Sequence, residues 1–285
     1  MSTNILEPDA TPLEQGDVVA VAATAAPNDP ILRIGRWLAA VTALICLAPI
    51  PLVLAVATTR VWQQGFWAGG FTLEWLANGW QRIAPNFAFS LRIAVLVLII
   101  DLLIGLPAAW LIARRRFPGR RALQALSTVP IAIPGIALAL GLILAYPTWK
   151  AGGWLLIAGH VLYTLPFMLG ALTPTLGRRD LIELEAVAAT LGASFPARLL
   201  TVTLPQIRTS LLAATIMVVT LSLGEFNVSF FLYTVMDTPL PVELYSGYIT
   251  MRLEVAAATT VWFLALVVPA AIALERLGGA KVGQA

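Results

Sequence analysis

The stretch LRIAVLVLIIDLLIGLPAAWLIA, residues 91–113, is followed directly by three arginines at positions 114–116. The hydrocarbon core of a bilayer is about 30 Å thick, and a helix needs about 20 apolar residues to cross it. This stretch has that length and carries one acid, Asp101, near its middle. It therefore predicts a transmembrane helix that ends in a basic turn.

Five further stretches of similar length and composition lie on either side of it. They are Trp37–Thr58, Leu123–Tyr146, Trp154–Leu176, Ser210–Tyr233 and Ala257–Leu274. Of the 285 residues, 59% are hydrophobic and 12% are charged, whereas soluble domains average about a quarter charged residues. We therefore expect an all-α integral membrane protein with six transmembrane helices in one domain, residues 31–276.

The basic residues are distributed unequally between the two sides of these spans. If the spans alternate in direction, thirteen of the eighteen Lys and Arg residues fall on one side. Positive residues are retained in the cytoplasm, so both termini and the turn 114–121 are predicted to be cytoplasmic. The segment 59–89 then faces outward, and its tryptophans suit an interfacial belt: Trp62, Trp67, Trp75 and Trp80.

The two ends of the chain are polar. Residues 1–30 are acidic and rich in Ala, Pro and Asp, without the basic start and short apolar run of a cleaved signal peptide. They are predicted to form a disordered cytoplasmic tail, and residues 277–285 a second, short cytoplasmic tail. The single cysteine, Cys46, excludes a disulfide within the chain.

The cytoplasmic loop 177–208 is too polar for a span and too long for a plain turn. Residues 180–191 have helical spacing, and Gly192 is suited to end that helix. Phe195-Pro196 would begin a second short helix, because proline is tolerated in a first helical turn, and Leu204-Pro205 would end it. Two short helices with a bend are suited to docking into a groove of another protein.

Two runs in this loop, EAVAATLGAS at 185–194 and VTLP at 202–205, resemble the loop of binding-protein-dependent ABC importer permeases. That family's pattern is Glu-Ala-Ala, three residues, Gly, nine residues, Ile, one residue, Leu-Pro. Gly192 and Pro205 keep the interval and Val202 replaces the isoleucine, but Ala186 stands where the pattern has glutamate, so Glu185 is one residue early. The resemblance implies an ATPase-coupling loop that includes Glu183, Glu185, Ala186, Ala188, Gly192, Ala193, Ser194, Leu204 and Pro205.

The resemblance extends along nearly all of the spans. PIAIPG at 130–135 and Gly159-His160 followed by Leu165-Pro166-Phe167 are similar to family patterns in the third and fourth helices. SLGEF at 222–226 with PLPV at 239–242 resembles the spermidine/putrescine-type branch, whose relatives serve aminoalkylphosphonate, thiamine and ferric iron. The resemblance implies the type I importer architecture and a small solute delivered by a separate solute-binding protein.

The chain lacks the motifs of catalysis and nucleotide binding. It contains no G-x-x-x-x-G-K-[ST], no H-E-x-x-H, no Cys/His cluster and no G-x-S-x-G. We therefore expect no enzyme activity, no metal and no cofactor in this chain, and ATP bound by a partner. The expected partners are two ATP-binding subunits, a second permease subunit (a heterodimer being favoured over a homodimer), the solute-binding protein and the lipid of a bacterial inner membrane, but no nucleic acid.

Four residues of the predicted spans are candidates for lining a solute path: Asp101, His160, Glu225 and Asn227. Ionisable groups in a membrane face the bundle interior, where they line a solute path or bond a neighbouring helix. Both interpretations stay open for these residues. A secondary transporter driven by an ion gradient is the alternative function; the sequence shows no internal repeat of the kind found in such proteins, and the loop 177–208 would have no purpose in one.

Overall fold

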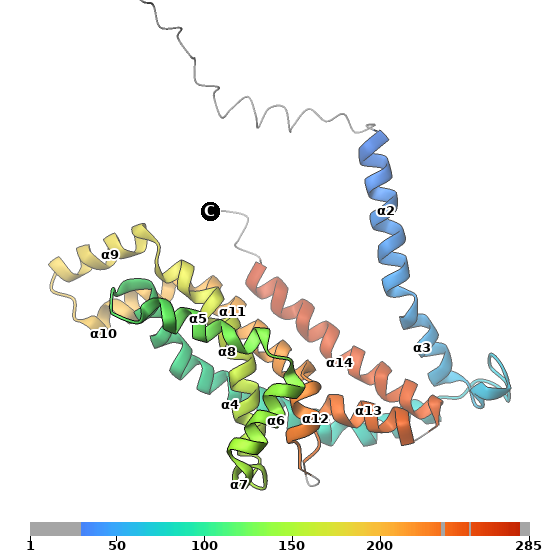
Figure 1. Ribbon diagram of the computed structural model, residues 1–285. Helices are drawn as coiled ribbons and strands as arrows, with labels where there is room; N and C mark the ends of the chain where they lie inside the picture. The colour runs from blue at the N-terminus through green and yellow to red at the C-terminus, as the bar shows by residue number, and fades with distance from the viewer. Residues whose placement is uncertain (1–29, 235–236, 251, 280–285) are drawn as a thin grey trace, which may run out of the picture. The chain divides into compact units, whose positions relative to one another are not determined.

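The structure is a computed structural model that describes residues 30–234, 237–250 and 252–279 (Figure 1). Its helices are α2 (Pro30–Leu47), α3 (Pro49–Thr58), η1 (Trp62–Gln64), α4 (Glu74–Arg114), α5 (Arg120–Ala132), α6 (Gly135–Ala145), α7 (Pro147–Lys150), α8 (Trp154–Leu176), α9 (Arg179–Thr190), α10 (Phe195–Arg198), η2 (Leu199–Thr203), α11 (Leu204–Gly224), α12 (Asn227–Leu232), α13 (Leu240–Thr250) and α14 (Leu253–Gly279). Two isolated β-bridges join Thr59 to Phe71 and Thr234 to Asp237. The prediction of an all-α protein is confirmed.

The chain divides into two compact units, Met1–Leu52 and Val53–Ala285. The described part of the first unit is α2 and the start of α3. The boundary between these helices falls at Ala48, directly before Pro49, which has no backbone N–H to continue the helix.

The core of the second unit is built on α8, which packs against both α4 and α11. Val97, Leu172 and Val218 are fully buried where these three helices meet. α12 lies close to α8 at Gly159, where a Cβ would stand 2.6 Å from Val228 Cγ1 and 2.7 Å from Leu232 Cδ1. Only glycine permits this approach, so Gly159 sets the distance between the two helices.

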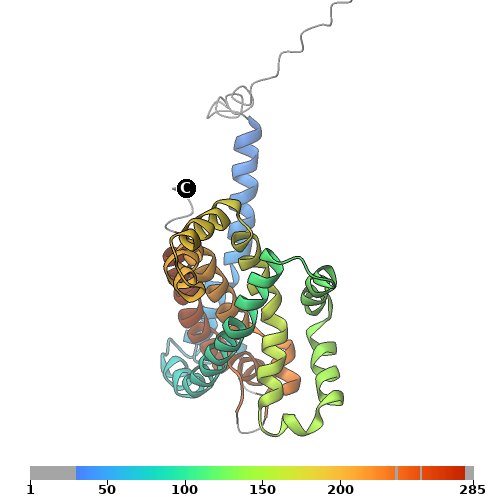
Figure 2. The same cartoon turned by 90° about the vertical axis from the view of Figure 1, so that its left-hand side faces the viewer.

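The third predicted span, 123–146, is a broken helix rather than a straight one. α5 and α6 are bent by 109° at the break between them. Ile133 precedes Pro134 and has an extended backbone (φ −87°, ψ 125°), as the clash with a following proline ring requires. Figure 2 shows the result, with α6 running beside α8 towards α7 and α5 turned away at its other end.

The fifth predicted span, 210–233, is also broken. α11 ends at Gly224, Glu225 is extended (φ −73°, ψ 112°), and the six-residue α12 follows. At its other end α11 is longer than predicted, because α10, η2 and α11 form one helix over Phe195–Gly224.

Within the described ranges, four helices are long and apolar enough to cross a membrane, or five if α5 and α6 count as one span. α14 adds a shorter apolar stretch, Leu253–Pro269. The membrane prediction is confirmed, while the count of six spans and the cytoplasmic termini stay predictions. The predicted tail 1–30 lies outside the described residues except for Pro30, as does most of the tail 277–285.

Candidate functional site

The loop 177–208, which is predicted to be cytoplasmic, contains α9, whose first turn carries Asp180. Arg178 forms an ion pair with this carboxylate, and their hydrogen bond lowers the pKa of Asp180. Both side chains are exposed, with more than half of their surface open to solvent. The pair therefore marks the start of the helix but adds little stability, since exposed ion pairs are well solvated.

α9 ends in a tight left-handed turn at Gly192, whose φ is +87°. Gly192 N–H donates to Ala189 O at 3.0 Å, and Ala193 N–H donates to Ala188 O at 3.0 Å. These two bonds define a Schellman motif, in which the residue at the left-handed position is usually glycine. The prediction that Gly192 ends the first loop helix is confirmed, and the motif explains the roles of Ala188 and Ala193 as backbone partners.

One side of α9 carries exposed apolar side chains. Leu184 is 47% exposed, Val187 57% and Leu191 83%. Glu183 and Ala186 are exposed as well, and Ser194 and Phe195 continue the exposed surface beyond the turn. The helix thus presents an apolar ridge that no other described residue covers.

Glu185 points the other way, into the protein. Its carboxylate accepts two hydrogen bonds from Arg114, at 3.0 and 3.2 Å, and one from Thr203 Oγ1 at 2.6 Å. The Arg114 side chain is only 8% exposed and that of Glu185 15%. Glu185 therefore ties α9 to the last turn of α4 and to η2.

Neither partner of Glu185 was predicted from the sequence. In the sequence, Arg114 is one of five arginines that indicate orientation, and Thr203 is the variable residue before Leu204-Pro205. An arginine at the end of another span was the available signal for an ion-pair partner of Glu185, but all five arginines of the turn 114–121 fit that signal equally well.

Leu204-Pro205 does not end a helix, contrary to the expectation from the sequence. Leu204 N–H donates to Leu199 O, five residues back, which makes η2 a turn of π-helix. A proline at position 205 lacks an N–H and its ring clashes with a carbonyl in a regular α-helix. The wider π turn accommodates the missing N–H and the proline ring, so the chain continues as a helix into α11.

A buried polar cluster joins α8, α11 and α12 inside the second unit. His160 is bonded through Nδ1 to Ser222 Oγ and through Nε2 to Ser229 Oγ, both at 2.9 Å. The ring is 2% exposed. With both nitrogens occupied, His160 holds three helices together, and the two serines contribute bonds that were not predicted from the sequence.

Asp101 lies fully buried on α4 and accepts a hydrogen bond from Thr164 Oγ1 on α8 at 2.6 Å. Its second oxygen, Oδ1, has no hydrogen-bond partner among the residues that the structure describes. Glu225 is 7% exposed and accepts a bond from Val228 N–H at 2.7 Å, which caps α12. Asn227 is exposed on the first turn of α12. The structure thus buries three of the four predicted path residues in hydrogen-bonded groups and leaves the fourth open.

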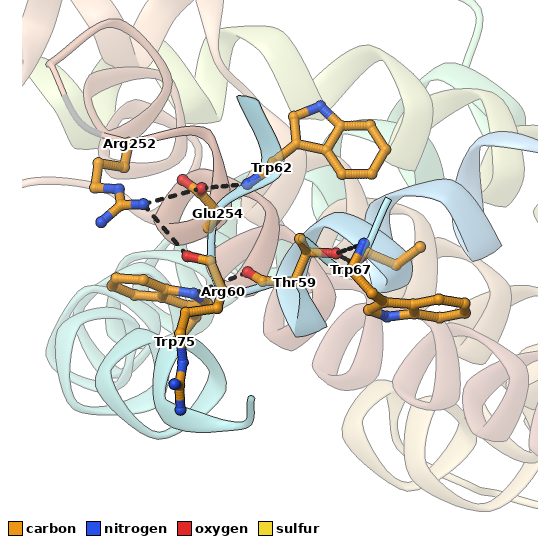
Figure 3. A network of polar contacts seen from close by, with 8 residues as sticks. Thr59, Arg60, Trp62, Trp67, Trp75, Arg252 and Glu254 are labelled. Atoms are coloured by element: carbon orange, nitrogen blue, oxygen red, sulfur yellow. Dashed lines mark hydrogen bonds and ion pairs between the residues drawn. The ribbon is translucent and has the colours of Figure 1, made fainter. Parts of the chain in front are cut away.

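The segment after α3 is held by a second polar network (Figure 3). Trp62 N–H donates to Glu254 Oε1 at 2.8 Å, and Arg252 bonds both Glu254 and Arg60 O. Arg252 also lies over the ring of Trp75, 4.9 Å from its centroid. The network clamps the segment to the start of α14.

This network changes the interpretation of the predicted tryptophan belt. Trp62 and Trp75 are partly buried and serve the packing of the segment, with Trp75 Nε1–H donating to Thr59 O at 3.0 Å. Trp67 and Trp80 are 51% and 41% exposed, respectively, and remain suited to a membrane interface. Among the described residues, no group of three or more His, Cys, Asp or Glu lies where it could hold a metal ion.

Comparison with known proteins finds relatives that are named as permease proteins of transport systems. No family model matches the chain. It is 28% identical over 243 residues to PhnV of Salmonella typhimurium, provisionally named a permease of a 2-aminoethylphosphonate transport system, covering 83% of this chain and 90% of that protein. It is 32% identical over 205 residues to CysT, the sulfate transport system permease protein of Escherichia coli, covering 66% of this chain and 70% of CysT.

A solved structure has the same fold. The crystal structure of a bacterial ABC transporter involved in the import of alginate, an acidic polysaccharide, matches 93% of this chain and 99% of its own with a TM-score of 0.64. The identity is 15%, so this likeness concerns the fold alone.

Proposed function

The chain belongs to the permease subunits of ABC importers, and from this premise we propose that α9 and the turn at Gly192 transmit the movement of an ATP-binding subunit to the transmembrane helices. As a member of that family it is a multi-pass inner-membrane transport subunit and not itself an enzyme. Such permeases work together with ATP-binding subunits, a second permease and a solute-binding protein.

The observation that carries the proposal is the opposite orientation of neighbouring side chains on α9. Leu184, Val187 and Leu191 are exposed, whereas Glu185 is bonded to Arg114. An apolar helix face that fits a groove is a common mode of docking. Because the reverse side of the same helix is fixed to the end of α4, a force on the exposed ridge reaches that long helix directly.

The assembly is proposed to contain two ATP-binding subunits and two permeases. One chain supplies one coupling loop, so a transporter with two ATPases needs a second permease with a loop of its own. Heterodimer pairing with a paralogue is favoured by resemblance to the polyamine-type branch. ATP is bound by the partner subunits and no cofactor is needed in this chain.

The proposed solute is a small organic ion of the polyamine or aminoalkylphosphonate class. A relative that covers most of the chain is named for 2-aminoethylphosphonate and another for sulfate. 2-Aminoethylphosphonate is therefore the first solute to test, followed by putrescine.

The test compares Leu191→Glu with Gln206→Glu, which adds a charge to another exposed cytoplasmic position. We expect that the purified Leu191→Glu permease no longer retains the ATPase. ATP-driven uptake of 2-aminoethylphosphonate in proteoliposomes should be lost as a consequence. Gln206→Glu should leave both unchanged. Retention of the ATPase by the Leu191 variant would show that docking uses another surface, and uptake driven by an ion gradient without ATP would favour a secondary transporter.

A further inference from the structure

The turn between α4 and α5 concentrates positive charge. Residues 114–121 contain five arginines and no acid. Arg114 is neutralised by Glu185, but none of the ion pairs of the described residues includes any of the other four. The turn therefore keeps most of its charge unneutralised.

Three of these arginines line one hollow. A pocket of about 600 Å³ is bordered by Arg116, Arg120 and Arg121, together with Phe117 and Gln124, and no carboxylate lines it. The Nε atom of Arg120 is buried and has no hydrogen-bond partner in the described parts of the chain. A buried donor without a partner is unfavourable, so an acceptor in the pocket would stabilise it.

The helix that begins at this pocket is amphipathic. Leu123, Leu126 and Val129 project from one side of α5 and are all exposed, at 38%, 66% and 43%. The polar residues Gln124 and Thr128 occupy the other side, in line with Arg120. No residue of α5 is buried. A helix with a basic polar face and an uncovered apolar face is typical of the boundary between membrane and water.

The neighbouring end of α4 also fits that boundary. Arg115 lies over the ring of Trp110, with its guanidinium carbon 5.7 Å from the centroid. Tryptophan is enriched at the level of the lipid headgroups. The guanidinium groups of the pocket thus lie on the short turn between Trp110, near the end of α4, and the exposed apolar side chains of α5.

We propose that this pocket binds the headgroup phosphate of an anionic phospholipid of the cytoplasmic leaflet, with an acyl chain along Leu123 and Leu126. The ligand chemistry is a phosphate diester, which accepts hydrogen bonds from several guanidinium groups at once. The cytoplasmic leaflet is anionic and attracts basic residues at its surface. The apolar side of α5 favours a lipid over a soluble phosphate, because an acyl chain can pack against that side and an inorganic phosphate cannot.

The test uses the purified full chain in detergent, with native mass spectrometry to count bound phosphatidylglycerol or phosphatidylcholine. The variant Arg116→Gln/Arg121→Gln removes two charges from the pocket. The control Arg179→Gln/Arg208→Gln removes two exposed charges from elsewhere on the same face. We expect the pocket variant to bind phosphatidylglycerol about 30-fold more weakly, the control to stay within about twofold, and phosphatidylcholine binding to be unchanged.

Three results would overturn the proposal. Equal weakening by both double variants would indicate general charge attraction without a site. Displacement of phosphatidylglycerol by millimolar inorganic phosphate would indicate a simple anion site. Loss of ATPase retention with unchanged lipid binding would assign the arginines to the partner subunit. If the double variant does not fold, Arg121→Gln alone should weaken phosphatidylglycerol binding about fivefold. Lipid binding is counted on the isolated chain and depends neither on transport nor on docking through Leu191, so the lipid site and the proposed function can fail separately.

Discussion

Among single residues, Glu185 is one whose side-chain orientation could not be inferred from the sequence around it. Its carboxylate accepts hydrogen bonds from Arg114 and Thr203, on two other elements. Because the Arg114 side chain is 8% exposed, loss of either partner would leave a poorly solvated charge or donor behind.

We expect Glu185→Gln and Arg114→Met each to lower the free energy of unfolding by about 2 kcal/mol, because each leaves a partner of the pair incompletely bonded. Glu183→Gln, on the exposed side of the same helix, should change it by less than about 0.5 kcal/mol. Thermal unfolding in detergent measures the difference. Similar values for the Glu183 and Glu185 variants would contradict the anchoring role.

The acids inside the bundle lead to a second prediction. Asp101 is fully buried and Glu225 caps α12, and in both cases an amide oxygen can accept the same hydrogen bond. We therefore expect Asp101→Asn and Glu225→Gln to assemble and to transport at near-normal rates. Asp101→Lys should fail to assemble, because it buries an unpaired cation. Normal assembly with lost uptake in the amide variants would instead place these acids on the solute path.

At the scale of elements, the contact between α8 and α12 depends on one missing Cβ. We expect Gly159→Ala to destabilise the protein by about 1–3 kcal/mol, because its Cβ would stand 2.6 Å from Val228 Cγ1 and the stiff valine cannot move freely. The matched control is Gly170→Ala on the same helix, where a Cβ meets nothing within 4 Å.

Thermal unfolding of both variants measures this difference. The double variant Gly159→Ala/Val228→Ala should recover part of the stability lost by Gly159→Ala, because it removes the clashing methyl groups. Equal stability of the Gly159 and Gly170 variants would show that α12 does not approach α8 so closely.

The elements also show what could be predicted from the sequence. The end of α9 at Gly192 follows from local chemistry, since a left-handed turn there favours glycine, and it was predicted correctly. The break at Ile133-Pro134 was visible as a proline, but prolines also occur inside α4 and α8 without ending them. Whether a proline bends or breaks a membrane helix depends on the neighbouring groups that can bond the freed backbone. The composition of the sequence does not identify those groups.

At the scale of the whole molecule, the charge asymmetry predicts the orientation of the chain. Alkaline phosphatase folds only outside the cytoplasm, so we expect it to be active when fused after Gln64 and inactive when fused after Pro118. Green fluorescent protein fused to the C-terminus should fluoresce if that end is cytoplasmic. The opposite pattern would reverse the orientation and remove the cytoplasmic loop from the reach of any ATPase.

The site could be predicted at the same scale only in part. The loop 177–208 was located from its polarity and family pattern, and its helix and turn are present. The bonds of Glu185 to Arg114, His160 to Ser229 and Asp101 to Thr164 each join residues more than 60 positions apart. Predicting them requires knowing which helices pack against each other. Spacing along the chain carries no information about such pairs.

The π-helical turn η2 has a consequence for the phase of the helix that contains it. A π turn holds one residue more than an α turn, and each residue of a regular helix rotates the chain by about 100°. Everything before Leu199 is therefore rotated by about that angle relative to the face that α11 presents to α8. Deleting one residue between 199 and 203 would rotate α9 about the axis of α11 by the same angle. The apolar ridge of α9 would then face a different direction from the one proposed for docking of the ATP-binding subunit.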